Sequence, residues 1–542
     1  MNLLLPCFAL YAETHFRFFP GQPSLLFRRE PEVIFDAPRR IAPGRDLPVY
    51  LVLNDIYRFP VELTSVEITL HCLESTQKSH IIIDNPATYL LGHALHWQSA
   101  SYLFLIQRDK FIGTDMFINA KAEYRTKRGH FRTVFNDNLP GSSKNSLLCH
   151  IAKEDFPGST HCIYGDMHLH SHYSQSHVEF GPPIRVIDLV AKAYGLDFVA
   201  VTDHSYDLAC DLRNYLRQDA TQSRWISFQE EFSGTCNKFQ SIVLPGEEIS
   251  CLNSRGKVVH MLGIGLTEYV PGTRDGARPN TAFKKQLTIG EAIEAVQAQN
   301  GLAFAAHPGS KCSIMQQIFL HRGMWEVADS HQNLDGFQAV NSGFACGWQR
   351  AKGLWTNELR NGHPLPLVAG NDSHGDFNRF RLIGVPFVKI EEHSKFFFGS
   401  YRTGIYGNAT NQQEVTDLIR QGRTFATGGP FITIAGSENV HDTLISNKAS
   451  ILPDNAVFVI AESTYEFGSI DEIRIIAGSC AAHSERVHRK LTYTPQTWFI
   501  SERIELRKSD PKSYLRAEIR CKRADNSTTQ AFTSPCWYHL NT

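Results

Sequence analysis

Histidine and carboxylate side chains stand within or directly after short apolar runs at six places in the chain. The six groups are Asp166-Met167-His168-Leu169-His170, Thr202-Asp203-His204, Glu247-Glu248, His260, Ala306-His307-Pro308 and Asn371-Asp372-Ser373-His374. Imidazole nitrogens and carboxylate oxygens are ligands for divalent metal ions. Five of the groups adjoin strand-like segments, and strand ends are where α/β barrels place their active sites. The sequence therefore predicts a metal-dependent hydrolase.

The spacing inside two of the groups suits ligation of one ion. His168 and His170 are two residues apart, so on a strand both imidazoles point to the same side. Asp372 and His374 repeat this spacing with one oxygen and one nitrogen ligand. A close pair of histidines is weak by itself in a chain with 24 of them. The prediction rests on the ordered set of groups.

The ligand types also constrain the metal. Mixed His and carboxylate ligation without Cys favours Zn, Mn or Fe over Mg or Ca. Six or more ligands exceed what one tetrahedral ion needs, so we expect two or three divalent ions with a bridging carboxylate. Glu247 and Glu248 are adjacent on a strand and point in opposite directions, so one faces the ions and the other is expected to be exposed.

The chain divides into three segments by pattern. Residues 1–156 carry short alternating runs separated by turn residues, which predicts a β-sandwich of unknown role. Residues 157–430 alternate strand-like and helical stretches, which favours a parallel sheet or barrel with surrounding helices. A helix is expected over Ile184 to Tyr194, and Thr288-x-x-Glu291 predicts a capping box. Residues 431–542 predict a second β-sandwich-like domain.

Composition limits the classes of binding partner and the cellular setting that we expect. The net charge of −1 offers no basic field for nucleic acid, so a small-molecule substrate is expected instead. Twelve scattered cysteines without a C-x-x-C pair indicate free thiols in a reducing, cytoplasmic setting. Glu13 and His15 interrupt the apolar start of the chain, which reads as a strand and not as a signal peptide. No run approaches the roughly 20 apolar residues of a membrane helix.

The motif order H-x-H, T-D-H, H-P and D-x-H, between Cys162 and Ile390, resembles the PHP metallohydrolases, named for polymerase and histidinol phosphatase domains. The resemblance implies a distorted (β/α)7 barrel, here flanked by N-terminal and C-terminal β-sandwich-like domains, with a two- or three-metal centre. Glu248 is preferred to Glu247 as the bridge because it precedes the apolar Ile249. By position, the implied metal ligands are His168, His170, His204, Glu248, His260, His307, Asp372 and His374.

The chain departs from this family at one point. Many members carry Asp-Gly shortly after the first motif, where Ser174 is here followed by Gln175-Ser176-His177. His177, His172 and Glu179 are the candidate replacements for the third ion, with His177 preferred. Softer motifs resemble the carbaryl-hydrolase-like branch of the family. They are Asn341-Ser342, Gly422-Arg423-Thr424-Phe425, Gly429-Pro430 and the ending from Ala531 to Trp537.

The expected chemistry is attack on phosphorus or a carbonyl carbon by hydroxide bound to several metal ions. His177 or His172 would serve as the leaving-group acid. Lys311 and Arg379 or Arg381 would clamp a phosphate, and Asn341 would contact the substrate.

Four functions remain open on sequence grounds. A phosphoesterase acting on a small molecule comes first, and a carbamate or amide hydrolase of the carbaryl-hydrolase type comes second. A non-catalytic metal-containing binding protein is the third. A polymerase-linked nuclease is the fourth, and the neutral charge argues against it.

Overall fold

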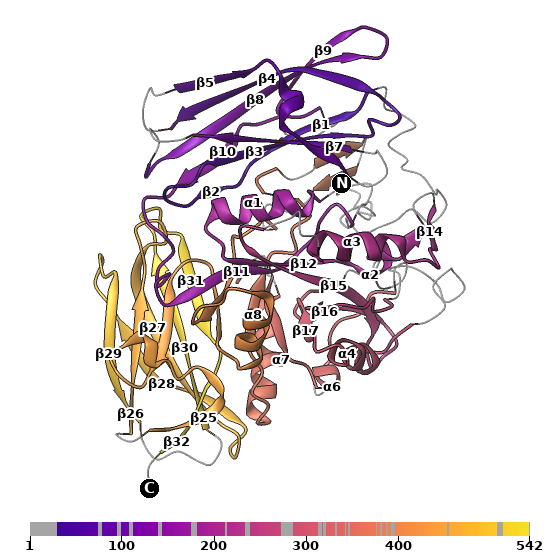
Figure 1. Ribbon diagram of the computed structural model, residues 1–542. Coiled ribbons are helices and arrows are strands. Elements are labelled where there is room, and N and C mark those ends of the chain that lie inside the picture. The colour runs from indigo at the N-terminus through magenta and orange to yellow at the C-terminus, as the bar shows by residue number, and fades with distance from the viewer. Residues whose placement is uncertain are drawn as a thin grey trace, which may run out of the picture.

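A computed structural model shows the chain folded into three adjoining parts, coloured indigo, magenta to orange, and yellow in Figure 1. The described residues are 30–73, 78–94, 99–107, 112–138, 144–174, 181–211, 214–233, 239–272, 286–312, 317, 321–330, 333–341, 343–344, 347–375, 377–379, 382–385, 388–391, 396–452, 455–506 and 513–540. Within these ranges no helix is both long and apolar enough to cross a membrane.

Two sheets built from residues 32–151 enclose an apolar core of their own. The first, in spatial order, contains β1 (Glu32–Asp36), β3 (Leu47–Asn54), β7 (Ser99–Ile106) and β6 (Leu90–Ala94). The second contains β2 (Arg40–Ile41), β10 (Leu147–Ile151), β8 (Asp115–Thr126), β4 (Val61–Cys72) and β5 (Lys78–Ile83), with β9 (Phe131–Phe135) beside β8. A short 3-10 helix, η2 (Pro86–Tyr89), precedes β6. Side chains along β8 alternate between buried and half-buried, as expected for a sheet with one face on a core.

A large curled sheet carries the six ligand groups in its first half. Its strands there, in spatial order, are β19 (Leu367–Gly370), β18 (Gly336–Asn341), β17 (Leu302–Ala306), β16 (Val258–Ile264), β15 (Ile242–Leu252), β12 (Phe198–His204) and β11 (Cys162–Leu169). A parallel bridge from Leu169 to Ser373 brings the far end of the sheet back beside β11. The ends of β11 and β19 are therefore neighbours.

Helices connect these strands. They are α1 (Ile184–Tyr194), α2 (Ser205–Leu208), α3 (Ser223–Ser233), α4 (Ile289–Gln297), α6 (Val327–Ser330), α7 (Trp348–Arg360) and α8 (Gln412–Arg420). The predicted helix over 184–194 is confirmed, and Gly195 ends it in the left-handed conformation at φ 99°. The predicted capping box is also confirmed, since the Thr288 side chain accepts from the Glu291 amide and the Glu291 side chain accepts from the Thr288 amide.

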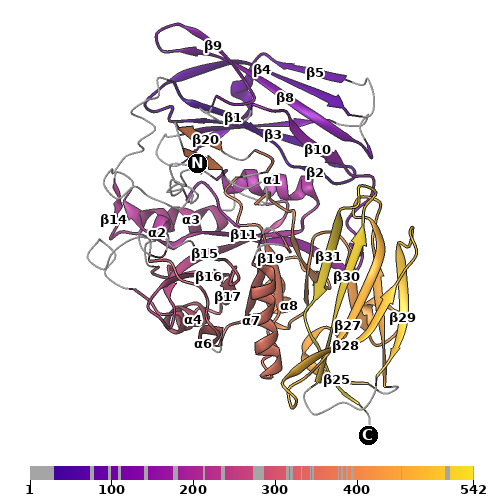
Figure 2. The same cartoon turned by 180° about the vertical axis from the view of Figure 1, so that it is seen from behind.

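The same sheet continues into the C-terminal segment. Beyond β11 it contains β22 (Arg402–Tyr406), β23 (Thr424–Thr427), β31 (Thr528–Thr533), β30 (Ser513–Lys522), β27 (Ser469–Ser479) and β28 (Ser484–Thr492), with β25 (Ser446–Leu452) and β32 (Cys536–Leu540) attached to β30. Facing it is a sheet of β24 (Phe431–Ala435), β26 (Ala456–Glu462) and β29 (Phe499–Glu505) (Figure 2). Smaller elements are β13 (Cys210–Asp211), β14 (Asn214–Gln218), β20 (Leu382–Val385), β21 (Val388–Glu391) and η3 (Val440–Asp442).

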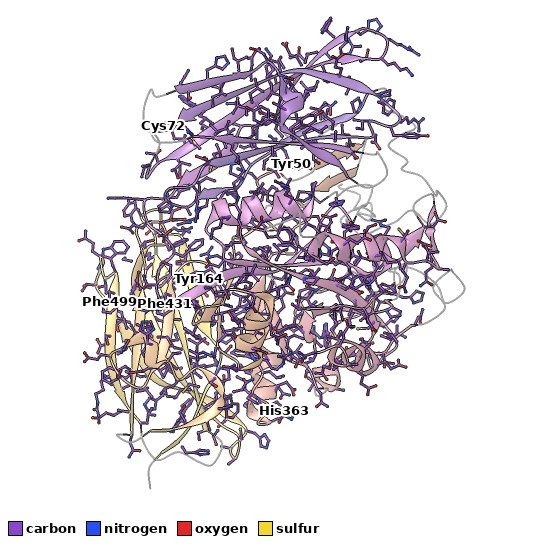
Figure 3. All side chains as sticks on the ribbon, viewed as in Figure 1. Tyr50, Cys72, Tyr164, His363, Phe431 and Phe499 are labelled. Carbon is purple, nitrogen blue, oxygen red and sulfur yellow. The ribbon has the colours of Figure 1, made fainter. Side chains whose placement is uncertain are left out.

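Aromatic packing joins the middle and C-terminal segments into one core. Tyr164 from β11 and Phe431 from β24 both pack edge-on against Phe425 of β23, at centroid distances of 5.8 and 5.6 Å. Figure 3 labels Tyr164 and Phe431 where the two segments meet. Edge-to-face pairs of this kind add to the stabilisation from apolar burial.

The predicted fold class, a distorted (β/α)7 barrel flanked by β-sandwich-like domains, is wrong. Strands make up 46% of the structure and helices 16%, and among the described residues one sheet of 15 strands runs from the middle segment into the C-terminal segment. A (β/α)7 barrel would alternate parallel strands and helices, whereas β16 pairs antiparallel with both of its neighbours, β15 and β17. Residues 253–257 make a tight turn, with Gly256 at φ 67°, so β15 leads directly into β16 without the crossover helix that such a barrel would place there.

Candidate metal centre

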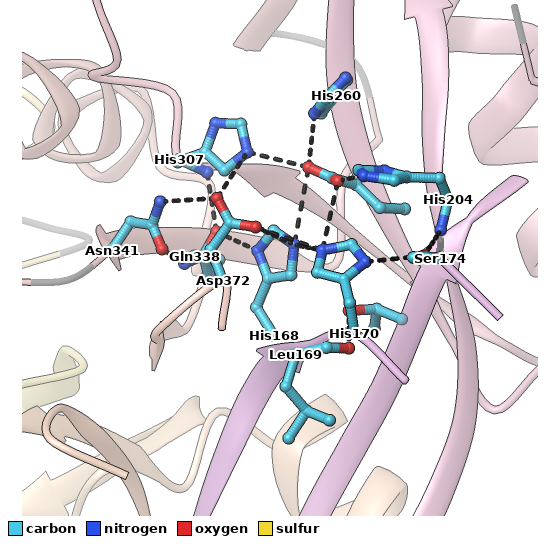
Figure 4. Close-up of polar contacts among 12 residues, drawn as sticks. His168, Leu169, His170, Ser174, His204, His260, His307, Gln338, Asn341 and Asp372 are labelled. Carbon is cyan, nitrogen blue, oxygen red and sulfur yellow. Dashed lines mark hydrogen bonds and ion pairs between the residues drawn. The ribbon is translucent and has the colours of Figure 1, made fainter. Parts of the chain in front are cut away.

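Six imidazoles and two carboxylates converge where β11, β12, β15, β16, β17 and β19 come together, and Figure 4 labels five of the imidazoles and Asp372. They are the eight residues named as implied ligands from the sequence. Glu248 lies at the centre. Its Oε1 is 2.9 Å from His307 Nε2 and 2.5 Å from His260 Nδ1, and its Oε2 is 2.9 Å from His204 Nδ1. A carboxylate with both oxygens against imidazoles has the geometry of a bridge between ions.

Asp372 approaches the same cluster from the other side. Its Oδ1 lies 3.2 Å from His170 Nε2 and 3.4 Å from His168 Nε2. His374 stacks on His170 at a centroid distance of 3.9 Å, and its Nε2 is 3.4 Å from His204 Nε2. The ligand atoms fall into three groups whose members lie within 4.8 Å of one another. These groups are His170, His204 and His374; His168, His170, Glu248 and Asp372; and Glu248, His260 and His307.

Backbone geometry holds the loop ligands in place. The Asp372 amide donates to the His168 carbonyl at 2.8 Å, and the His170 amide donates to the Ser373 carbonyl at 2.8 Å. Asp372 and His307 both have left-handed φ angles, of 56° and 31°. Non-glycine residues in this region are strained, and such strain often accompanies functional sites.

Ser174 contacts both the backbone and a ring nitrogen of the cluster. Its hydroxyl oxygen accepts from the His204 amide at 2.9 Å and lies 3.2 Å from His170 Nδ1. The other ring nitrogen, His170 Nε2, faces Asp372 Oδ1 at 3.2 Å and Glu248 Oε2 at 3.6 Å. The two carboxylates repel one another, and a cation between them would relieve that repulsion.

A second observation supports the fit of a cation. His204 Nδ1 and Glu248 Oε2 are buried and form an ion pair at 2.9 Å that lacks the alignment of a hydrogen bond. Binding of both atoms to a metal ion would compensate their burial better than this contact does. The donor set of imidazole and carboxylate groups suits Zn, Mn or Fe.

Burial and the charges within the cluster shift the pKa values of its side chains. Burial lowers the pKa of His168, but the charges of Asp372 and Glu248 outweigh it and raise the pKa to about 9. Burial together with His204 and His168 lowers the pKa of His374 to about 4. Burial opposes ionisation of Glu248, but the surrounding histidines hold its pKa well below the usual range. The two carboxylates are therefore ionised, as metal ligation requires.

Glu247 corrects one expectation. The side chain was expected to be exposed, but it is fully buried on the opposite face of β15. Its Oε1 accepts a hydrogen bond from the Val270 amide at 2.9 Å, and burial raises its pKa well above the usual value. Glu247 is thus a buried carboxyl outside the cluster, and burial favours its protonated form.

The residues predicted to bind substrate or to act as the leaving-group acid lie in different surroundings. Asn341 lies beside the cluster and donates from Nδ2 to Asp372 Oδ2 at 3.3 Å. Lys311 is exposed in the loop after β17. His172 is buried, with Nε2 3.6 Å from Glu231 Oε1. His177 and Arg381 lie outside the described residues, so their predicted roles stay predictions.

Arg379, expected to clamp a phosphate, contacts the N-terminal sheets. Its NH1 forms an ion pair with Asp137 Oδ2 at 3.1 Å, and its backbone amide donates to Asp36 Oδ1 at 2.9 Å. Both partners belong to the N-terminal sheets, and the Arg379 side chain is buried against them. Arg379 therefore anchors those sheets to the middle segment.

Three residues beside the cluster were missed. Gln338 of β18 contacts His168 and the His307 amide. Glu231 of α3 accepts from the Tyr173 hydroxyl at 2.8 Å, and burial raises its pKa to about 7. In the sequence, Gln338 could have been noticed as the polar residue inside the apolar run 336–340.

Arg322 is the third missed residue. It is buried, and its guanidinium donates to His260 Nε2. Neutral His260 then carries its hydrogen on Nδ1, which donates to Glu248. His260 would ligate an ion through Nδ1 only as the other tautomer, with its hydrogen on Nε2 and the Arg322 contact rearranged.

Comparisons with known proteins leave the family unassigned. No protein-family model matches the chain, and no curated protein matches it. A beta-glucuronidase from Bacteroides uniformis has a TM-score of 0.17 at 10% identity, covering 94% of this chain and 61% of that one. One from Parabacteroides merdae has a TM-score of 0.18 at 8% identity, covering 94% and 66%. This chain thus spans about three fifths of the length of the first of these, and such low TM-scores assign neither a fold nor an activity.

Proposed function

We propose that the chain is a metal-dependent hydrolase, acting most readily as a phosphoesterase on a small molecule. The observation that supports this is the convergence of His168, His170, His204, Glu248, His260, His307, Asp372 and His374 in one buried cluster. The order of their motifs, which resembles that of the PHP metallohydrolases, supports the same proposal.

The residues of the cluster would have different roles in metal binding. Glu248 would bridge two ions, because its two oxygens face different histidines. Asp372 and His170 would hold an ion near β19, and His307 and His260 one near β17. Bound divalent ions lower the pKa of water and stabilise negative charge on a substrate oxygen. The near-complete burial of the ligands would keep bulk water from competing.

Arg322 favours an anionic substrate over a neutral one. Its guanidinium donates to His260 Nε2, whose ring separates Arg322 from Glu248, so its positive charge would act on an anionic substrate through space and not by a direct hydrogen bond. Burial lowers the pKa of Arg322 to about 9, which leaves it charged at neutral pH. Carbamate or amide hydrolysis needs no such charge, and it remains the second candidate because the same donor set would serve it.

The test is a screen of protein loaded with Zn, Mn or Fe on phosphomonoesters, phosphodiesters, aryl carbamates and anilides. The proposal expects two or three ions per chain by elemental analysis and turnover of a phosphoester. His307→Ala should reduce turnover by at least about 100-fold, since loss of even an outer-shell partner costs 10–100-fold. His80→Ala, on a half-exposed histidine of β5, is the control.

Turnover of carbamates or anilides alone would replace the phosphoesterase proposal with the second candidate. Bound metal without turnover of any substrate would favour a binding protein. Failure to retain any ion after reconstitution would exclude both hydrolase proposals.

A further inference from the structure

Gln338 connects three of the strands that carry the cluster. It stands in the middle of β18, fully buried, between β17 and β19. Its Oε1 accepts from the His307 amide at 2.8 Å and lies 3.3 Å from His168 Nδ1. Its Nε2 donates to the Val340 carbonyl and to Asn341 Oδ1, both at 3.2 Å. Figure 4 shows Gln338 between His307, His168 and Asn341.

The orientation of the Gln338 amide is fixed by backbone groups. The His307 amide can only donate, so it requires the oxygen of Gln338. The Val340 carbonyl can only accept, so it requires the nitrogen. An amide flipped by 180° would lose both bonds. His168 Nδ1, which faces the fixed oxygen, must therefore carry a hydrogen and donate it.

This donation selects the tautomer of His168. When a metal ion displaces one proton of His168, the N–H that remains is the one on Nδ1, and Nε2 supplies the lone pair. That nitrogen is 3.4 Å from Asp372 Oδ1 and 3.6 Å from Glu248 Oε1. The lone pair and the two carboxylates thus face a common point where a cation would be stabilised. Partners of this kind set the tautomer and the ring orientation of metal-ligating histidines.

The same side chain reaches Asp372 through Asn341. Gln338 Nε2 donates to Asn341 Oδ1, which sets the Asn341 amide so that its Nδ2 donates to Asp372 Oδ2 at 3.3 Å. His307 and Asp372 both have strained, left-handed backbones. Gln338 therefore contacts one strained ligand directly and the other through one residue.

We propose that Gln338 is a positioning residue for metal binding, which fixes the His168 tautomer and holds His307 and Asp372 through the hydrogen bonds described above. The inference rests on the proposed function. It also changes the predicted role of Asn341, from substrate contact to support of Asp372.

The test compares Gln338→Met, which removes both halves of the amide, with Gln338→Glu, which keeps the accepting oxygen and the shape. The readout is Zn²⁺ affinity, measured by competition with a colorimetric chelator, on protein whose folded fraction is checked by circular dichroism. Gln338→Met should bind Zn²⁺ 10–100-fold more weakly than wild type. Gln338→Glu should lose less, because His168 and the His307 amide keep their acceptor.

Gln299→Met is the matched control. Gln299 also accepts from two backbone amides, those of Thr267 and Glu268, but far from the cluster. The Gln299→Met variant should leave Zn²⁺ affinity unchanged. Equal affinity in wild type and Gln338→Met, or no difference between the Met and Glu variants, would overturn the inference. A wild-type protein that binds no Zn²⁺ would instead overturn the proposed function.

Discussion

Glu247 and Glu248 are consecutive residues of β15, both fully buried, and their pKa values shift in opposite directions. Glu248 faces the imidazole cluster, which holds its pKa well below the usual range. Glu247 faces the other side, where burial raises its pKa well above the usual range and the Val270 amide is its hydrogen-bond donor. Strand geometry puts neighbours on opposite faces, so one residue step separates a carboxyl of the cluster from a carboxyl of the core.

This relationship gives a matched pair of variants for the metal centre. Glu248→Gln should lower metal content after dialysis, because an amide replaces the charged bridge between His307 and His204. Glu247→Gln changes the same atoms one residue away and should retain wild-type metal content. Elemental analysis of the two proteins side by side measures the difference, and equal content would contradict the assignment of Glu248 as the bridge.

Stability should depend on pH through Glu247. In the unfolded chain its carboxyl ionises near its ordinary pKa of 4.5, whereas burial keeps it protonated in the folded state well above that pH. The unfolded state then binds fewer protons as pH rises, so stability falls from about pH 4.5 upward until the folded pKa is reached. The slope from this group is roughly 1.4 kcal/mol per pH unit.

Urea unfolding at several pH values, with chelator present throughout, measures that slope. Glu247→Gln should flatten it and leave the variant more stable than wild type near neutral pH. Chelator removes the contribution of metal binding, and the histidines of the cluster titrate in both proteins and cancel. Parallel curves for the two proteins would show that Glu247 ionises freely in the folded state.

Metal removal should destabilise the wild-type fold. Without an ion, the buried atoms His204 Nδ1 and Glu248 Oε2 form an ion pair that lacks the alignment of a hydrogen bond. An ion present at 100 times its dissociation constant stabilises by about 2.7 kcal/mol, and chelation removes that contribution. Calorimetric melting before and after chelator measures the effect. Glu248→Gln should show little response to chelator, and an insensitive wild type would contradict a bound ion.

Local sequence patterns could identify the eight residues of the cluster because each stands in or shortly after an apolar strand segment. A local sequence pattern does not show which strands pair with one another across the chain. The hairpin turn at 253–257 and the pairing of β11 with β22, 240 residues later in the chain, were invisible to it, which is why the predicted barrel is wrong. Burial of Glu247 depends on Val270, a partner in a distant loop.

The same limit applies to the residues around the ligands. Gln338 looks like an interruption of an apolar strand until His168 and His307 are placed on either side of it. Arg379 follows the last motif closely, which favoured a role at the site, but its partners Asp36 and Asp137 come from residues more than 200 positions earlier. A short-range signal identifies ligand types, and the contacts that orient them come from the assembled sheets.

The Arg379 ion pair offers a test that separates an anchor from a substrate clamp. Arg379→Met would leave the Asp137 carboxylate buried without its guanidinium, and breaking a buried pair in this way costs about 3–5 kcal/mol. Urea unfolding should show that loss, while the KM of the folded enzyme for a phosphoester stays unchanged. Lys311→Met is the comparison, because Lys311 is exposed and its loss should change stability by at most about 0.5 kcal/mol. A higher KM in the Arg379 variant, with stability intact, would restore the phosphate clamp, since an anchor acts on the folded state and not on the substrate.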